Sequence, residues 1–457
     1  MATRLSDTSH EALGLIPDDL LAMYRTMLTA RLVDEAAFRL NRQGKAPFVV
    51  PVSGHEGCQI GTAWALERGR DVWLPYYRDL GVVLVAGMTP YEVFLGLFAK
   101  ADDPASGGRQ MPAHWSSRRL GIISGSSPIG TQIPHAAGIA YAVKYREEDA
   151  VVASWFGEGA TSEGDWHEGL NFAGIHRLPV VFVCENNRYA ISVEQSKQMA
   201  VENVADRAAA YGFPGVVVDG NDVLACFAAM KEAVARARSG RVPTLIECKT
   251  YRFFPHTSDD DDRTYRTREE VEEAKRKDPI PAFASYLKRV GIVDDDKVEA
   301  IREELKAEMD KGVDEAWNAP DPEPGPGEVL VELRAASLNR LDVWIRKGLP
   351  SVPKPRILGA DGAGLVDGRR VLINPGIEHG ERITVVGEHM DGTHAELIAV
   401  PETNVYPIPD GMSFEEAAAF PLVYETAYRM LVTRAGLRED EWVLVWGVGG
   451  GVSTAAN

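Results

Sequence analysis

Residues 151–160 have the sequence Val151-Val152-Ala153-Ser154-Trp155-Phe156-Gly157-Glu158-Gly159-Ala160, an apolar run that ends in two glycines around a carboxylate. A second apolar run, residues 180–184, is followed by Glu185-Asn186-Asn187. Near-continuous apolar runs are typical of strands that are buried on both faces of a parallel sheet. The two runs therefore predict two neighbouring parallel strands, each ending in polar residues.

A helix is expected between these strands. Ser162-Glu163-Gly164-Asp165 predicts a capping box, and Trp166, Leu170, Ala173 and Gly174 then fall on one helical face. Strand, helix and strand make a βαβ unit, so residues 1–318 are expected to form an open α/β domain with a parallel sheet. In such sheets ligands bind at the carboxyl ends of the strands.

Proline alternates through residues 319–327, Ala-Pro-Asp-Pro-Glu-Pro-Gly-Pro-Gly, which predicts an extended linker between two bodies. Before the linker, apolar residues at three-to-four spacing predict a helix that begins at three aspartates, 294–296. Its expected apolar face is Val298, Ile301, Leu305, Met309, Val313 and Trp317. After the linker, residues 328–333 predict a strand.

The composition excludes several classes of protein. The 457 residues carry a formal net charge of −18, which argues against a general nucleic-acid binder because such proteins need clustered lysine and arginine. The four cysteines (Cys58, Cys184, Cys226 and Cys248) include no CxxC pair, so we expect buried free thiols. Residues 1–14 lack the apolar stretch of a secretory signal, and no apolar run is long enough for a membrane span. A soluble, cytoplasmic protein is expected.

The polar segments that follow the two predicted strands, 157–160 and 185–187, predict a metal and diphosphate site. We call these segments the two loop tips. Glycines at 157 and 159 allow the backbone to approach a ligand closely, and the following helix start offers free N–H groups to an anion. A carboxylate at 158 and an amide oxygen on the other loop are hard ligands, suited to a Mg²⁺ ion that also binds phosphates. Taken singly, the glycines could simply make a turn and the asparagines could simply end a strand.

The spacing of the two tips favours the functional interpretation. Twenty-six residues separate Gly159 from Asn186, which resembles the thiamine diphosphate fingerprint, a GDG followed at about that distance by NN. Two other phosphate motifs are missing: the sequence contains no GxxxxGK[ST], and the Gly157 loop does not continue as GxGxxG.

Further segments narrow the resemblance. They are residues 74–78 (LPYYR), 126–134 (SSPIGTQIP), 157–165 (GEGATSEGD) and 255–260 (PHTSDD). In this order they resemble the alpha subunit of the thiamine-dependent decarboxylase component of 2-oxo acid dehydrogenase complexes, and the resemblance covers residues 1–318. It implies oxidative decarboxylation of a 2-oxo acid and transfer of the acyl group to a lipoyl arm.

The resemblance implies roles for individual residues. Mg²⁺ would be held by Glu158, the side chain of Asn187 and the backbone carbonyl of Tyr189. Tyr77 and Arg78 would grip the diphosphate, and Gly157, Gly159 and Ala160 would cradle it with backbone. Ser127 and Ile129 would line the middle of the cofactor. A monovalent cation such as K⁺ would be held by the loop containing Ser126, Pro128, Thr131 and Gln132.

His256 resembles the active-site loop histidine that meets the diphosphate and the incoming lipoyl group. A histidine there could exchange protons near neutral pH. Arg266 would anchor this loop. The remaining histidines of the first body have no comparable context and are interpreted as structural: His55, His114, His135, His167 and His176.

Two residues depart from the family pattern. Glu158 replaces the commoner aspartate, which resembles the branched-chain subgroup and favours 2-oxoisovalerate as substrate over pyruvate or acetoin. Glu185 stands where some members place an arginine toward the diphosphate, which would weaken charge complementarity or mark a bacterial subgroup.

Partners follow from the same resemblance. The carboxylic acid that activates the cofactor belongs in this family to a beta subunit, so an alpha2-beta2 heterotetramer on a lipoyl-bearing acyltransferase core is expected. A non-catalytic assembly subunit is the alternative within this class. No nucleic acid or membrane partner is expected.

Residues 321–457 resemble a different family. Segments 339–344 (NRLDVW), 358–364 (LGADGAG), 374–376 (NPG) and 417–421 (AAAFP) resemble the amino-terminal, GroES-like half of medium-chain alcohol dehydrogenases and quinone reductases. This body contains no cysteine, so a Cys₄ structural zinc is excluded. The expected fold is a partial, mostly-β GroES-like domain over residues 328–440.

Residues 441–457 resemble the start of a truncated Rossmann unit. An apolar strand, Trp442–Trp446, is expected before the glycine cluster 447–453, but the acidic residue about 20 positions further on is missing. We therefore interpret the cluster as a relic and the chain as a fusion. An NAD(P)H-dependent oxidoreductase acting through this tail is the alternative function.

Overall fold

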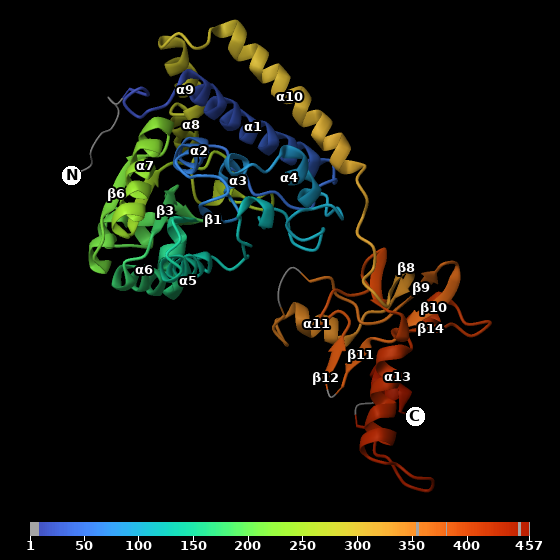
Figure 1. Ribbon diagram of the computed structural model, residues 1–457. Coiled ribbons are helices and arrows are strands. Elements are labelled where there is room, and N and C mark those ends of the chain that lie inside the picture. The colour runs from blue at the N-terminus through green and yellow to red at the C-terminus, as the bar shows by residue number, and fades with distance from the viewer. Residues whose placement is uncertain (1–8, 353–355, 381, 447–448, 457) are drawn as a thin grey trace. The chain divides into compact units, whose positions relative to one another are not determined.

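The computed structural model describes residues 9–352, 356–380, 382–446 and 449–456. Its contacts divide the chain into two compact units, Met1–Pro322 and Glu323–Asn457 (Figure 1). Each unit is described by itself below. None of the helices in the described part of the chain has the length and apolar content needed to cross a membrane.

A five-stranded sheet forms the centre of the first unit. Its order is β1–β2–β3–β7–β6, and every neighbouring pair is parallel. The strands are β1 (Val72–Leu74), β2 (Val152–Gly157), β3 (Val180–Asn186), β6 (Gly215–Asp219) and β7 (Thr244–Lys249). The predicted open parallel sheet is therefore confirmed, with the two apolar runs adjacent and with Gly157 paired to Glu185.

Helices cover both faces of this sheet. Successive side chains of a strand point to opposite faces, so neighbouring residues of one strand pack into different cores. Phe156 packs into a core with α5 (Gln132–Tyr145) and α6 (Gly164–His176). Trp155, its neighbour in β2, packs into a larger core with helices on the other face, which include α2 (Glu56–Trp64) and α7 (Val223–Gly240). The strands are consequently apolar on both faces.

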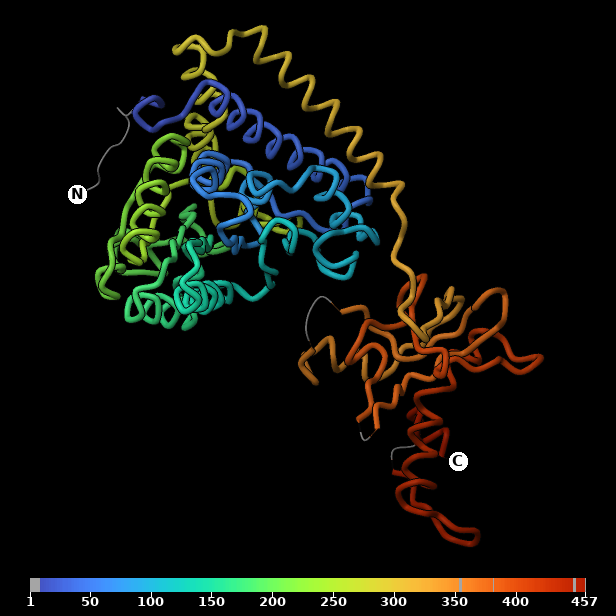
Figure 2. The backbone as a smooth tube through the Cα atoms, in the orientation of Figure 1, coloured from blue at the N-terminus to red at the C-terminus, as the bar shows by residue number. Residues whose placement is uncertain are grey.

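A long helix, α10 (Asp295–Trp317), lies beside α1 (Pro17–Arg42) on the outside of the unit (Figure 2). The side chain of Asp294 accepts a hydrogen bond from the N–H of Lys297 and caps the helix. The predicted apolar positions Ile301, Leu305 and Met309 are buried. The remaining helices of the first unit are α3 (Leu80–Ala86), α4 (Pro90–Leu97), α8 (Arg268–Lys275) and α9 (Pro279–Arg289).

The capping box predicted for α6 is wrong. Residues Glu158–Ser162 form a 3₁₀ turn, and the helix begins at Gly164 with Glu163 as its N-cap residue. Ser162 thus lies one position too early to cap the helix, and no side chain makes the cap hydrogen bond. The helix starts later because the residues directly after β2, Glu158–Ser162, form the 3₁₀ turn.

The second unit is built on an antiparallel sheet of order β13–β8–β9–β10–β14. The strands are β8 (Glu328–Ala336), β9 (Gly362–Val366), β10 (Arg369–Ile373), β13 (Leu397–Pro401) and β14 (Val405–Pro407), and β11 (Gly376–His379) and β12 (Arg382–Val385) form a separate hairpin. Short helices α11 (Arg340–Arg346), α12 (Phe414–Ala418), α13 (Pro421–Tyr428) and α14 (Gly451–Ala455) complete the unit. The expected mostly-β GroES-like fold is confirmed.

The strand predicted at Trp442–Trp446 does not form. These residues have no regular secondary structure, and Trp442 is 99% exposed. A strand needs a hydrogen-bonding neighbour, and none pairs with this segment in the described part of the second unit. Gly447 and Val448 of the glycine cluster lie outside the described residues.

Candidate functional site

A cavity of about 310 Å³ lies at the carboxyl ends of β2 and β3. The topology explains its position, because the loops that follow parallel strands leave the sheet at the same edge. The cavity brings together the predicted cofactor and metal residues of the first unit. Its lining includes Tyr77, Arg78, Ser127, Ile129, Gly157, Glu158, Gly159, Ala160, Asn187, Tyr189 and His256.

Glu158 is buried at the wall of this cavity. Its side-chain oxygen Oε2 accepts a hydrogen bond from the N–H of Asn187 at 3.3 Å, while Oε1 is buried and has no hydrogen-bond partner among the described residues. Burial raises the pKa of the carboxyl group. A buried carboxylate oxygen without a partner is costly, and a bound cation would remove that cost.

The neighbouring loop supplies further oxygen atoms. The side-chain oxygen of Asn187 accepts a hydrogen bond from the N–H of Tyr189 at 3.2 Å, which fixes the turn after β3. Gly159 allows this loop to come close, because a Cβ atom there would lie 2.7 Å from the Cβ of Ala190. Carboxylate, amide and carbonyl oxygens at one place are a donor set that fits Mg²⁺.

Arg78 supplies a buried positive charge. Its guanidinium donates to the carbonyl oxygen of Pro51 and, through Nη2, lies 3.1 Å from Nδ1 and 3.2 Å from the carbonyl oxygen of His256. The side chain also lies over the ring of Tyr77, at 5.6 Å. The guanidinium is therefore held in place before any anion binds, as a diphosphate site requires.

Arg252 is a second buried cation in the cavity wall, and the sequence analysis did not select it. Its Nη2 donates to the carbonyl oxygen of Ile191 and to the hydroxyl of Tyr265, whereas its buried Nη1 has no partner among the described residues. Burial and the charge of Arg78 lower its pKa. Only the sheet topology could have indicated Arg252 as a site residue, because it follows β7, whose carboxyl end lies beside that of β3.

His256 lies on the loop after β7, with its ring 5.9 Å from that of Tyr77. Burial, followed by the charges of Arg78 and Arg252, lowers its pKa to about 3. In this arrangement the imidazole is neutral at physiological pH, so the expected proton exchange near neutrality requires a change in the surrounding charge. An anion near the two arginines would raise this pKa.

Arg266 ties the His256 loop to the body of the unit. Its guanidinium donates to the carbonyl oxygens of Arg252 and Phe254 and pairs with Asp262 at 2.6 Å. The ring of Tyr251 lies 5.3 Å below it. These contacts hold the His256 loop in place, as the resemblance implied for Arg266.

The loop considered for a monovalent cation is held by its own hydrogen bonds. The hydroxyl groups of Ser126 and Thr131 contact each other and also lie 3.3 and 3.2 Å from the carbonyl oxygen of Pro128. Gln132 instead donates to the carbonyl oxygen of Trp155 at 2.9 Å. Ile129 is 41% exposed and presents its side chain at the cavity.

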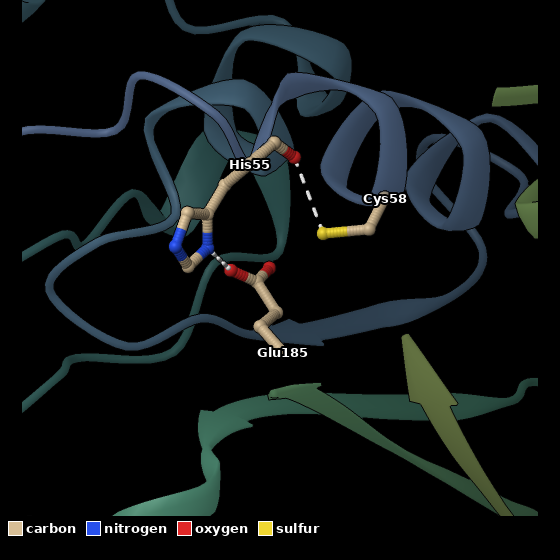
Figure 3. Close-up of side chains that lie close together, drawn as sticks. All are labelled: His55, Cys58 and Glu185. Carbon is tan, nitrogen blue, oxygen red and sulfur yellow. Dashed lines mark hydrogen bonds and ion pairs between the residues drawn. The ribbon is translucent and has the colours of Figure 1, made fainter. Parts of the chain in front are cut away.

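Glu185 does not line this cavity, but it contacts Tyr76, which does. Its Oε2 accepts a hydrogen bond from Nδ1 of His55 at 2.8 Å (Figure 3). The same oxygen accepts from Gln59 at 3.0 Å and from the hydroxyl of Tyr76 at 3.1 Å. The two alternatives for Glu185, weaker charge complementarity toward a diphosphate or the mark of a bacterial subgroup, both stay open, although the side chain is buried and is not part of the cavity lining.

His55, Cys58 and Glu185 are also a possible metal-ligand set by residue type, with donor atoms within 4.8 Å of one another (Figure 3). However, Oε2 of Glu185 already accepts three hydrogen bonds, and Cys58 donates to the carbonyl oxygen of His55. Oε1 of Glu185 and Nε2 of His55 are nevertheless buried without a hydrogen-bond partner among the described residues. We interpret the group as a partly hydrogen-bonded core cluster that includes His55. All four cysteines are buried and free, as expected.

The second unit has a cavity of its own, of about 640 Å³. Its lining is mainly apolar and aromatic and includes Phe420 and Tyr424, whose rings stack at 4.3 Å. Asp361, which directly precedes β9, is fully buried and accepts hydrogen bonds from Ser337, Asn339 and the N–H of Leu422. These contacts satisfy the carboxylate with donors from the protein itself.

Comparison with known families gives two matches on this chain. Residues 24–325 match the dehydrogenase E1 component family, and residues 325–410 match the alcohol dehydrogenase GroES-like domain family. Together they support a fusion of two unrelated families, as the two resemblances implied.

Individual relatives agree with the first match. The 2-oxoisovalerate dehydrogenase subunit alpha of Bacillus subtilis (strain 168) is 52% identical over 316 residues, which are 69% of this chain and 96% of that protein. The 3-methyl-2-oxobutanoate dehydrogenase subunit alpha of Mycobacterium tuberculosis (strain ATCC 25618 / H37Rv) is 41% identical, covering 67% of this chain and 81% of that protein. The pyruvate dehydrogenase E1 component subunit alpha of Staphylococcus aureus (strain N315) is 40% identical, covering 66% and 80%.

A solved structure resembles part of the chain. A crystal structure of an NAD-dependent alcohol dehydrogenase is 46% identical, with a TM-score of 0.28, and the match covers 30% of this chain. The chain spans about half of that protein, 48% of its length.

Proposed function

Because the chain belongs to the dehydrogenase E1 component family, we propose that its first unit is the alpha subunit of a thiamine diphosphate-dependent 2-oxo acid dehydrogenase. The observation that carries this proposal is the buried, unpartnered Oε1 of Glu158 in a cavity that also contains Arg78 and Asn187. Such a site offers oxygen ligands to a divalent cation and guanidinium groups to phosphate oxygens.

Each residue has a distinct task in this proposal. Glu158, Asn187 and the carbonyl oxygen of Tyr189 would hold Mg²⁺, while Tyr77, Arg78 and the backbone of 157–160 would hold the diphosphate. Arg252 adds a second buried guanidinium, with an unused N–H donor. Ser127 and Ile129 would line the middle of the cofactor. A bound thiamine diphosphate would supply the carbanion and the electron sink for loss of CO₂.

The reaction would be oxidative decarboxylation of a 2-oxo acid. The carboxylate of the substrate leaves as CO₂, and the acyl group is transferred to a lipoyl disulfide, which is reduced as it accepts the acyl group on one sulfur. We propose a branched-chain substrate of the 2-oxoisovalerate type, supported by the names of the 52% and 41% identical relatives and by Glu158 at the fingerprint. Pyruvate and acetoin are the alternatives.

Partners complete the site in this proposal. Ser126 to Ile129 are exposed at the cavity in the isolated chain, where a second protein would cover them. We propose a beta subunit in an alpha2-beta2 heterotetramer, which docks on a lipoyl-bearing acyltransferase. His256 on its anchored loop would meet the lipoyl group, and K⁺ could bind at the loop of Ser126 and Thr131.

The test is Glu158→Gln in the chain co-expressed with a beta subunit. We expect the magnesium-dependent affinity for thiamine diphosphate, measured by titration calorimetry, to fall about 10- to 100-fold, because the amide cannot supply the charge. Thermal stability should not fall, since the substitution removes a buried charge whose Oε1 has no partner among the described residues, and the amide oxygen can still accept from the N–H of Asn187. Glu168→Gln, an exposed position on α6, is the matched control. Equal affinity of Glu158→Gln and the wild type would contradict the proposal.

A further inference from the structure

His114 contacts the cavity through a serine. Its Nε2 lies 2.6 Å from the hydroxyl oxygen of Ser127, and its Nδ1 lies 3.1 Å from the carbonyl oxygen of Met111 and 3.3 Å from that of Pro112. Ser127 lines the cavity, whereas His114 is not part of its lining. His114 is therefore one hydrogen bond removed from the cavity wall at Ser127.

These contacts determine which ring nitrogen carries the proton. Carbonyl oxygens can only accept hydrogen bonds, so Nδ1 beside two of them must be the donor. When the imidazole is neutral, Nε2 is then an acceptor, and the hydroxyl of Ser127 donates its only hydrogen to it. The oxygen of Ser127 consequently offers only lone pairs to the cavity.

We infer that His114 is a positioning residue, which turns the Ser127 hydroxyl so that it accepts a hydrogen bond from an N–H or O–H group of the bound cofactor. This inference rests on the proposed function, because it takes the cavity as the thiamine diphosphate site. It replaces the structural interpretation of His114 made from the sequence. A free hydroxyl could rotate and present its hydrogen, whereas this one is fixed before the ligand arrives.

Two substitutions separate the roles of the two ring nitrogens. His114→Asn keeps a donor near the carbonyl oxygens of Met111 and Pro112, but its side chain is too short to reach Ser127. His114→Gln places an amide oxygen near the position of Nε2, where it can still accept from the hydroxyl. A structural role would be preserved better by asparagine, and a positioning role better by glutamine.

The experiment measures the dissociation constant of thiamine diphosphate with Mg²⁺ by calorimetry, in the chain assembled with a beta subunit. We expect Ser127→Ala to weaken binding about three- to tenfold and His114→Asn about two- to fivefold, with His114→Gln within about twofold of the wild type. Adding His114→Asn to Ser127→Ala should cause no further loss, because His114 acts only through the hydroxyl.

Several results would overturn the inference. They are wild-type affinity in His114→Asn, a larger loss in His114→Gln than in His114→Asn, and additive losses in the double variant. If His114→Asn does not fold, the comparison is between His114→Gln and Ser127→Ala, and equal losses in the two count against the inference. Absence of magnesium-dependent binding in the wild type would instead contradict the proposed function itself.

Discussion

At the scale of single residues, the environment of His256 in the cavity disfavours the protonated form of its imidazole. The folded chain keeps its imidazole neutral, with a pKa of about 3, because the ring is buried beside Arg78 and Arg252. The unfolded chain has the ordinary histidine pKa of about 6.5. Below that value the unfolded chain takes up a proton that the folded chain does not, so stability is present above pH 6.5 and is lost as the pH falls toward 3.

This difference predicts the pH dependence of stability. Between pH 7 and pH 5.5 the wild type should lose up to about 1 kcal/mol of unfolding free energy through His256, and His256→Gln should not show this part of the loss. Urea denaturation of both proteins at the two pH values measures it. Parallel losses in the two proteins would show that the loop opens and protonates His256 without unfolding.

From residue pattern alone, the candidate site could be predicted only at the strand ends, whereas Tyr77, Arg78, Ser127, Ile129 and His256 were predicted through the family resemblance. Glu158 and Asn187 directly follow β2 and β3, so their convergence follows from sheet topology. The contact between His114 and Ser127 joins two irregular segments, whose paths depend on tertiary packing. Arg252 was missed because a single arginine after a strand has no distinctive pattern.

At the scale of elements, a glycine turn before α2 packs against the loop that follows β7. Gly54 has a φ of +100°, and a Cβ atom there would lie 2.0 Å from the carbonyl oxygen of Tyr251. Gly44 has a φ of +73° but no atom within 4 Å of the same position. The two glycines share a backbone conformation and differ in the space around them.

Alanine at each glycine therefore separates backbone strain from steric overlap. We expect Gly44→Ala to cost about 1 kcal/mol of unfolding free energy and Gly54→Ala at least about 3 kcal/mol. Chemical denaturation provides both values. Similar costs at the two sites would mean that the turn moves away from Tyr251 without penalty.

Elements were predictable where local pattern and packing agree. The α10 helix has both an aspartate cap and a long apolar face, and it forms as expected. Residues 442–446 have the composition of a strand, but a strand exists only with a pairing partner, which local sequence does not specify. The cap of α6 failed for a related reason, because the 3₁₀ turn at Glu158 displaces the start of the helix.

At the scale of the whole molecule, the two units are expected to unfold independently. Residues Pro320 and Asp321 still bond to Ala101 and Lys100 of the first unit, whereas residues 323–327 contain no helix or strand. We propose residues 319–327 as the linker between a thiamine diphosphate-binding domain and a GroES-like domain, with residues 441–457 resembling the start of a Rossmann unit.

Limited proteolysis should therefore cut first within residues 323–327 and near the exposed segment 442–446. After cleavage at the linker, the calorimetric unfolding midpoint of the first unit should change by less than about 2 °C, because its core lies within its own helices and sheet. A tail as resistant to protease as the first unit would contradict the interpretation of 442–446 as unpaired, and a large shift in the midpoint would show that the units stabilise each other.

The pairing of Gly157 with Glu185 across β2 and β3 has a consequence for how this sequence can vary in length. One extra residue inside β3 would reverse which of its side chains face each core. It would also shift Asn187 along the sheet edge relative to Glu158. Surface loops elsewhere tolerate insertions far more easily. Functional members of this lineage should accordingly accept insertions and deletions at distant surface turns while keeping the lengths of these two strands constant.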